Sequence, residues 1–114
     1  MKYFVMILMA AAGMLLAGCS DSPEDVTRKW IEALAEGDAV KANGYSTENV
    51  RILNSIVAAS VQNGLELDKL NKALENLDDA KVEINGDIAN IAMKDGRIFT
   101  LKKVDSDWKV DVGK

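Results

Sequence analysis

Hydrophobic residues along the chain recur first at helical spacing and then, from Ala80 onwards, at every second position. Over residues 23–79 the apolar positions lie three or four apart, which is typical of helices that bury one face. Over residues 80–112 apolar and charged residues alternate, which is typical of strands with one face against a core. The pattern therefore predicts an α+β domain, in which N-terminal helices cover the apolar face of a C-terminal antiparallel sheet.

Turn and capping residues place the first two helices. Ser22 suits the N-cap of a helix over residues 23–36, with a proline at its first position and Gly37 just past its end. A short helix is then predicted from an Asp38 cap to about Asn43, where Asn-Gly breaks it. Little chain therefore separates the first helix from the second.

Two further helices are predicted before the sheet. The third begins at a Thr47 cap and ends before Asn63-Gly64, and the fourth covers residues 66–77. The expected buried stripe of the third helix is Val50, Leu53, Ile56 or Val57, and Val61. The fourth helix carries a leucine stripe, Leu67, Leu70, Leu74 and Leu77. Such a stripe is either an ordinary buried face or a docking face for a partner, and the sequence leaves both open.

Four strands and three tight turns are predicted after residue 80. The strands are expected at residues 81–84, 88–94, 97–104 and 108–112. Asn85-Gly86 and Asp95-Gly96 favour hairpin turns because glycine adopts the positive φ angles that such turns need, and residues 105–107 form the third turn. Short connections between consecutive strands predict a four-stranded antiparallel meander.

The start of the chain has the three parts of a secretory signal. Lys2 is followed by an apolar run over residues 4–16, and the small residues Ala17 and Gly18 precede Cys19, the only cysteine in the chain. The apolar run is shorter than the ~20 residues that a membrane-spanning helix needs. We therefore expect cleavage between Gly18 and Cys19, and conversion of the Cys19 thiol to a thioether with a diacylglyceryl group.

This Leu16-Ala17-Gly18-Cys19 run resembles the lipobox of bacterial lipoproteins. The resemblance implies that residues 1–18 are a signal peptide and that Cys19 carries three acyl chains, palmitate among them. Residues 19–22 would then be a lipidated tether and residues 23–114 a single domain. Because Ser20 rather than aspartate follows the cysteine, the sorting rule of Gram-negative lipoproteins implies the periplasmic face of the outer membrane.

The composition of the mature chain limits its partners. Of the 14 basic side chains only Lys2 would be removed, which leaves 13 basic against 18 acidic groups and a formal charge of −5. A surface of this sign excludes nucleic acid as a partner. A single cysteine forms no disulfide within the chain, so packing must stabilise the 96 residues that remain after residues 1–18.

Few side chains suit catalysis, because the chain has no histidine. The candidate acid–base groups are Asp38, Asp87, Asp107 and Tyr45. A structural role fits each of these aspartates better, Asp38 as a helix cap and Asp87 and Asp107 as turn residues. The carboxylate pairs at residues 24–25 and 78–79 lack the spaced oxygen ligands of a calcium loop. The sequence therefore predicts a non-enzymatic protein with no metal and no cofactor.

The larger apolar side chains have two readings. Trp30, Tyr45, Met93, Phe99 and Trp108 are the residues that would line an apolar pocket between helices and sheet. A domain of this size equally needs them to fill its core.

Three further features accompany the lipobox: the Pro-Glu-Asp-Val helix with Trp30, the Glu-Gly-Asp at residues 36–38, and the Asp-x-Asp-Trp-Lys-Val-Asp ending at residues 105–111. Together they resemble small bacterial lipoproteins with a cystatin-like domain, similar to the nuclear-transport-factor-2-like superfamily. The resemblance implies helices packed into a curved sheet.

We expect a membrane-tethered binding or interaction module whose partner is an envelope protein or a small apolar ligand. Two alternatives stay open. One is an isomerase or dehydratase on the same fold, which needs a buried aspartate beside Tyr45. The other is an inhibitor or immunity factor for a cell-wall hydrolase.

Overall fold

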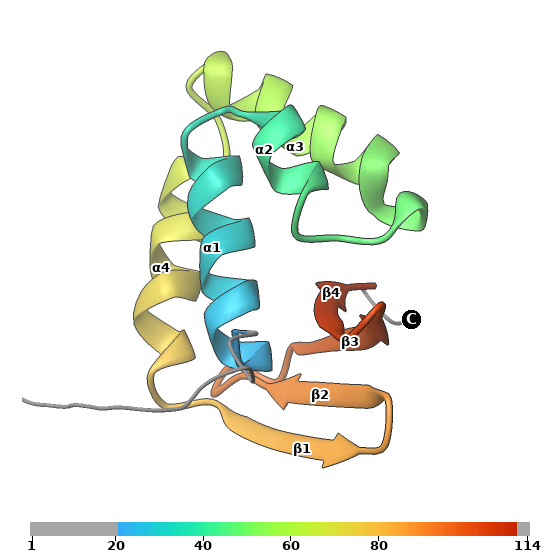
Figure 1. Ribbon diagram of the computed structural model, residues 1–114. Coiled ribbons are helices and arrows are strands. Elements are labelled where there is room, and N and C mark those ends of the chain that lie inside the picture. Colours follow the sequence, from blue (N-terminus) through green and yellow to red (C-terminus); the bar gives the residue numbers. More distant parts are fainter. Residues whose placement is uncertain (1–20, 112–114) are drawn as a thin grey trace, which may run out of the picture.

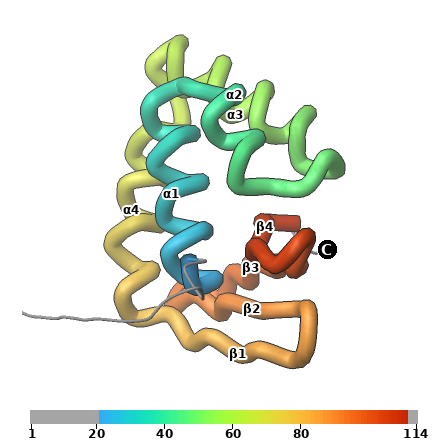
Figure 2. Tube along the Cα trace, viewed as in Figure 1, coloured from blue at the N-terminus to red at the C-terminus, as the bar shows by residue number. Residues whose placement is uncertain are grey.

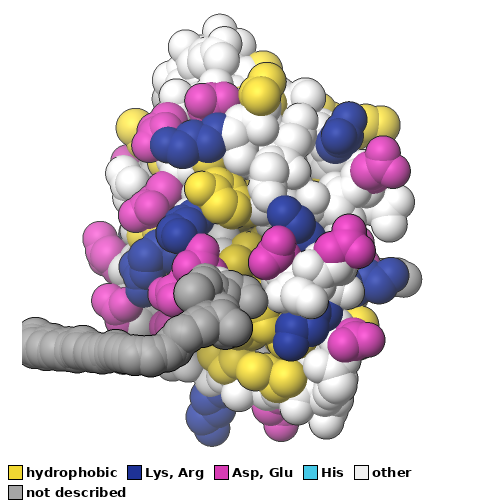
Figure 3. All heavy atoms as spheres, in the orientation of Figure 1, with side chains coloured by type: hydrophobic (Ala, Val, Ile, Leu, Met, Phe, Trp, Pro, Cys, Tyr) yellow, Lys and Arg dark blue, Asp and Glu magenta, His cyan; other side chains and the backbone are white. Residues whose placement is uncertain are grey.

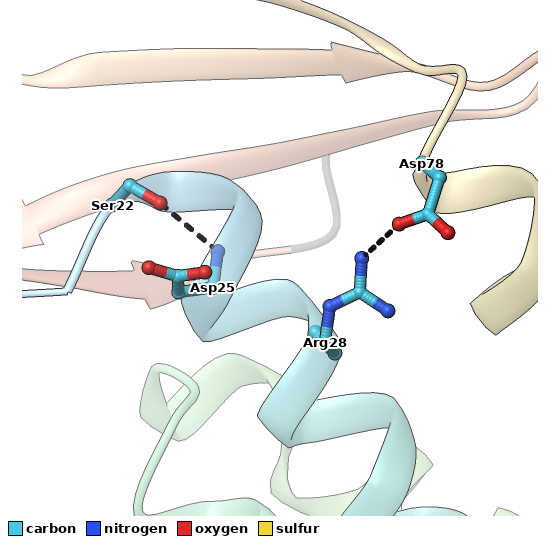
Figure 4. A network of polar contacts seen from close by, with 4 residues as sticks. All are labelled: Ser22, Asp25, Arg28 and Asp78. Carbon is cyan, nitrogen blue, oxygen red and sulfur yellow. Dashed lines mark hydrogen bonds and ion pairs between the residues drawn. The ribbon is translucent and has the colours of Figure 1, made fainter. Parts of the chain in front are cut away.

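The computed structural model describes residues 21–111, which form helices followed by a four-stranded sheet (Figure 1). Helix α1 spans Pro23–Ala35. The Ser22 Oγ accepts a hydrogen bond of 3.2 Å from the Asp25 amide, which satisfies one of the free N–H groups at the helix start (Figure 4). Gly37 follows the helix with φ +74°, as glycine commonly does after a helix end. The predicted caps of α1 are therefore confirmed.

The second and third helices differ in how they begin. Helix α2 spans Ala39–Asn43, and its predicted cap is made, because the Asp38 carboxylate accepts a 3.0 Å bond from the Lys41 amide. Helix α3 spans Arg51–Gln62 and is preceded by a 3-10 turn, η2, over Glu48–Val50. The predicted Thr47 side-chain cap is not made, because the Thr47 hydroxyl donates to the Asp111 carboxylate instead.

Helix α3 buries only part of the predicted stripe. Val50 just before the helix is fully buried as predicted, but the buried residues within it are Asn54 and Ala58. Leu53 is 38% exposed, so the predicted stripe is wrong at that position. Of the two alternatives at the next position, Ile56 is 59% exposed and Val57 packs against the core. Apolar residues lie on several sides of this helix, so their spacing alone does not select the buried side.

Helix α4 spans Leu67–Leu77 and packs along α1 (Figure 1). Leu77 is fully buried, Leu70 and Leu74 pack against the core, and Leu67 is 41% exposed. The leucine stripe thus serves mainly as the buried face of α4. At the end of α4, the Asp78 carboxylate binds the Arg28 guanidinium of α1 at 2.6 Å (Figure 4).

The sheet is an antiparallel meander in the order β1-β2-β3-β4. Its strands are β1 (Lys81–Asn85), β2 (Ile88–Ala92), β3 (Ile98–Val104) and β4 (Asp107–Val110). Gly86 and Gly96 occupy the first two turns with φ +61° and +97°, as the sequence predicts. The third turn places Asp105 and Ser106 at positive φ, a region that non-glycine residues seldom adopt. Val112, expected in the last strand, lies outside the described residues.

The core lies between α1 and the inner face of the sheet. α1 packs against β4 and β2, and four inner-face residues are fully buried: Ala89, Ile91, Leu101 and Val110. The α+β class predicted from the sequence is thereby confirmed. Helical cover does not reach β1, whose inner-face residues Val82 and Ile84 are 38% and 55% exposed. In Figure 2 the β1–β2 hairpin extends past the lower ends of α1 and α4.

Candidate functional site

The five residues considered for an apolar pocket all belong to the packed interior or border it. Trp30, Met93 and Trp108 are at most 7% exposed, and Tyr45 and Phe99 pack against the same core. The rings of Trp30 and Phe99 meet edge to face, with centroids 5.9 Å apart. The interior is therefore held together by these side chains.

A small hollow lies beside Tyr45 and Trp108. It measures about 190 Å³, below the ~300–1,000 Å³ of typical ligand pockets. Asp107 lies at the same hollow, and the Lys109 ammonium next to it donates a 2.7 Å bond to the Gly44 carbonyl. This hollow brings a candidate aspartate close to Tyr45.

The candidate acid–base aspartates are all exposed to solvent. Asp38 accepts the bond that caps α2, Asp87 lies in the β1–β2 turn, and Asp107 opens β4. The enzyme hypothesis requires a buried aspartate beside Tyr45, and Asp107 at the hollow does not meet that requirement.

The two carboxylate pairs lie at helix ends. Glu24 and Asp25 occupy the first turn of α1, where negative charge complements the helix dipole. Asp78 is held by Arg28 (Figure 4). Within residues 21–111, no group of three or more acidic, cysteine or histidine side chains is close enough to hold a metal ion.

In three exposed ion pairs, one member has a shifted pKa. The pKa of Lys29 is raised, chiefly by its hydrogen bond to Asp21, and that of Lys41 is raised by its hydrogen bond to Glu36. The pKa of Asp95 is lowered from its ordinary 3.8, first by the side-chain hydrogen bond from Arg97 and then by the Arg97 backbone amide. All three pairs are solvated and connect neighbouring segments.

A buried polar cluster joins α1, α2 and α3. The Trp30 indole Nε1 donates a 2.8 Å bond to the Asn54 Oδ1. The Asn54 amide nitrogen in turn donates to the Asn43 Oδ1 at 2.8 Å and to the Ser46 Oγ at 2.9 Å. Asn54 is fully buried, and every buried side-chain nitrogen and oxygen of the described residues has a partner. The sequence pattern did not predict this cluster, because an asparagine within a helix ordinarily faces water.

Helices α2 and α3 carry several exposed apolar side chains. Val40, Ile52 and Ile56 are 81%, 76% and 59% exposed, and Ala59 continues the stripe one turn after Ile56. A hollow of about 540 Å³ between the two helices lies beside this stripe and is lined by Val40 and Ala59 among others. We call Val40, Ile52, Ile56 and Ala59 the α2–α3 surface. Exposed apolar patches of this kind mark binding sites for other proteins.

The sheet offers a second exposed region at β1. On its outer face, a hollow of about 510 Å³ is formed by two cross-strand rows, Lys81–Ala92–Ile98 and Glu83–Asn90–Thr100. On its inner face, Val82 and Ile84 stay exposed, and Figure 3 shows hydrophobic side chains gathered over the β1–β2 hairpin. Both faces of β1 are therefore open to solvent.

The predicted cleavage and lipidation residues, Gly18 and Cys19, lie outside the described residues. None of the helices described for residues 21–111 has the length and apolar character that crossing a membrane requires. Comparisons of the chain with protein-family models, with curated proteins and with solved structures found no match.

Proposed function

We propose that this protein is a lipid-anchored envelope lipoprotein that acts as a non-enzymatic interaction module at the periplasmic face of the outer membrane. The single observation that carries the proposal is the Leu16-Ala17-Gly18-Cys19 run placed directly ahead of the folded domain. A thiol at this position is the acceptor that lipoprotein acylation needs. The resemblance to small lipoproteins with a cystatin-like domain supports the same proposal.

The short tether would hold α1 close to the lipid. A single residue, Ser20, separates Cys19 from Asp21, and the two steps along the chain span at most about 7 Å. Helix α1 has 13 residues and is therefore about 20 Å long. The α2–α3 surface follows the far end of this helix, because Glu36, Gly37 and Asp38 line its hollow. An anchored molecule would thus present the α2–α3 surface away from the tether.

The partner that fits this surface is another envelope protein with a complementary apolar face. Ile52 and Ile56 are largely exposed to water. When a partner covers such side chains, the complex is stabilised by about 25 cal/mol for each Å² of apolar area that is buried. Exposed charged residues adjoin this surface in the sequence, Arg51 before Ile52 on α3 and Lys41 after Val40 on α2, and such charges would favour one orientation of the partner.

Metabolic acyl labelling tests the anchor. The wild-type chain is expected to incorporate a labelled fatty acid and to sediment with membranes, and a Cys19→Ala variant is expected to do neither. Mass spectrometry of the mature N-terminus gives the site directly. An unlabelled wild-type product that starts at a residue other than Cys19 would contradict the proposal.

Photo-crosslinking in intact cells tests the binding surface. A photoreactive amino acid at Ile56 is expected to give one discrete adduct with an envelope protein. The same amino acid at Leu65, which is 61% exposed but lies in the loop between α3 and α4, serves as the matched control. Equal adducts from both positions, or none from Ile56, would remove the α2–α3 surface from the proposal.

A further inference from the structure

The two edges of the sheet differ in how they are covered. At the β4 edge, the Val110 amide donates a 2.8 Å bond to the Tyr45 carbonyl, and the Thr47 amide donates a 2.9 Å bond to the Val110 carbonyl. The segment between α2 and η2 thus closes this edge. At the other edge, β1 pairs with β2 alone among the described residues. An open edge of this kind is a template for pairing with another strand.

The register shows which backbone groups of β1 are free. The Met93 amide donates a 2.7 Å bond to the Arg97 carbonyl, so the odd-numbered residues of β2 direct their peptide groups toward β3. Because alternate residues of an antiparallel strand face opposite neighbours, the even-numbered residues of β2 face β1. These lie opposite the odd-numbered residues of β1. The N–H and C=O groups of Val82 and Ile84 therefore point to the open edge.

We propose that a second copy of this chain pairs antiparallel along β1, in the two-fold register centred on Val82. The two four-stranded sheets then join into one continuous antiparallel sheet. This inference goes beyond the proposed function and does not depend on the lipid anchor. It identifies β1 as the self-association surface and leaves the α2–α3 surface of each copy free.

Charge selects this register from the alternatives. With Val82 at the two-fold axis, Lys81 of each copy lies opposite Glu83 of the other, in the position where side chains approach most closely. A register centred on Glu83 would place two glutamates opposite each other, and one centred on Lys81 would place two lysines together. A register centred on Ile84 would put Glu83 opposite the neutral Asn85. Only the Val82 register places both charged residues of β1 against opposite charges.

The same register matches the apolar residues of the inner face. Val82 lies opposite Val82 of the second copy, and Ile84 lies opposite the second copy's Ala80. These side chains are exposed or partly exposed in the single chain, since no helix covers β1. Cross-strand apolar pairs of this kind stabilise antiparallel sheets. The exposed inner face of β1 thus acquires a neighbour that the fold of one copy does not supply.

Disulfide crosslinking of the full-length chain in membranes tests the register. In the proposed dimer, two Val82→Cys chains place their cysteines directly opposite at about 5.5 Å between Cα atoms, within disulfide range. Ile84→Cys is the matched control, because it lies on the same strand and face but faces Ala80 of the second copy, four residues along the strand from that copy's own residue 84. Mild oxidation is expected to give a covalent dimer for Val82→Cys and none for Ile84→Cys. The wild-type chain has Cys19 as its only cysteine, so a covalent dimer of the wild type would show that lipidation failed and that Cys19 forms the bridge. A failure of lipidation is thereby distinguished from a failure of β1 pairing.

Two results of the crosslinking would overturn the inference. One is a monomer for Val82→Cys under conditions that oxidise a control thiol. The other is a bridge that forms between co-expressed Val82→Cys and Ile84→Cys chains but not between two Val82→Cys chains, which is the pattern of the Glu83 register.

Charge exchange gives an independent test by sedimentation of the purified chain. Lys81→Glu and Glu83→Lys each replace two attractive pairs with two repulsive ones, and each is expected to weaken the dimer roughly tenfold, or about 1.4 kcal/mol. The double variant restores opposite charges and is expected to dimerise like the wild type. Both side chains are exposed, so the variants are expected to fold normally. A double variant as weak as the single ones would overturn the register.

Discussion

The indole nitrogen of Trp30 donates a 2.8 Å hydrogen bond to the side-chain oxygen of Asn54, and both residues are buried. This bond connects α1 to α3, and through Asn43 and Ser46 it extends to α2. A buried donor that loses its acceptor costs the full desolvation penalty of the group. The orientation of α3, and therefore of the α2–α3 surface, rests on this pair.

Replacement of Asn54 by leucine is expected to lower the free energy of unfolding by about 1–3 kcal/mol, because the Trp30 N–H and the Asn43 and Ser46 oxygens lose their common partner. Urea unfolding monitored by tryptophan fluorescence measures the loss. Asn71→Leu is the control, since Asn71 is exposed on α4 and its replacement is expected to change stability by no more than about 0.5 kcal/mol.

A double-mutant cycle with Trp30→Phe isolates the bond itself. Removal of donor and acceptor together leaves neither group unpaired, so the double variant is expected to lose less stability than the sum of the two single variants. Strict additivity would show that the Trp30–Asn54 bond contributes no coupling.

Gly37 and Gly64 both follow a helix at positive φ, but their surroundings differ. A Cβ at Gly37 would lie 3.0 Å from the Gln62 Cγ, whereas a Cβ at Gly64 would have no atom within 4 Å. Alanine at either position is expected to cost about 1–2 kcal/mol for the left-handed backbone. Gly37→Ala is expected to cost about 1 kcal/mol more, because Gln62 must move and its 2.8 Å bond to the Gly37 carbonyl weakens.

Unfolding of both glycine variants in the wild-type chain and in a Gln62→Ala background separates the two contributions. Without the Gln62 side chain, the two glycine variants are expected to lose similar amounts of stability. A larger loss for Gly64→Ala than for Gly37→Ala would contradict the assignment of the extra cost to Gln62.

The pKa of Asp95 lies below its ordinary 3.8 because Arg97 donates both a side-chain and a backbone hydrogen bond to its carboxylate. A carboxyl whose pKa is lower in the folded state stabilises the fold above the unfolded-state pKa. That contribution is lost as the pH falls through the folded-state pKa, so the affected window lies below about pH 4. Because the pair is exposed, the effect on stability is expected to be small and to weaken with salt.

NMR titration of the Asp95 carboxyl carbon measures this shift. The midpoint is expected below 3.8 in the wild type and higher in an Arg97→Ala variant. High salt is expected to move the wild-type midpoint toward its ordinary value. An unchanged midpoint in Arg97→Ala would show that Arg97 is not the cause.

Local signals were sufficient for the helices and turns. Ser22 and Asp38 make the predicted caps, Gly37 and Gly86 adopt positive φ after a helix and in a hairpin, and the alternation from residue 80 predicts the meander. These features depend on backbone conformation within a few residues, which short sequence patterns encode. Boundaries shifted where a tertiary contact intervened, as at Thr47, whose hydroxyl binds Asp111 rather than its own helix.

The faces of the elements were predicted less well. Leu53 was expected to be buried and is 38% exposed, whereas Asn54, which the predicted stripe did not include, is buried. Which side of α3 faces inward depends on Trp30, 24 residues earlier in the chain, and no local pattern contains that information. The exposure of Val82 and Ile84 likewise depends on how far the helices extend over the sheet.

By itself, the sequence determined the order of helices and strands, the turns between them and the cysteine expected to carry the lipid, because these are set by residues adjacent along the chain. Only the tertiary structure decided which apolar residues stay exposed on α3 and β1, and that the β4 edge is covered while the β1 edge is open. The physical reason is that burial and edge pairing are properties of segments brought together from distant parts of the chain, and they follow from the packing of those segments.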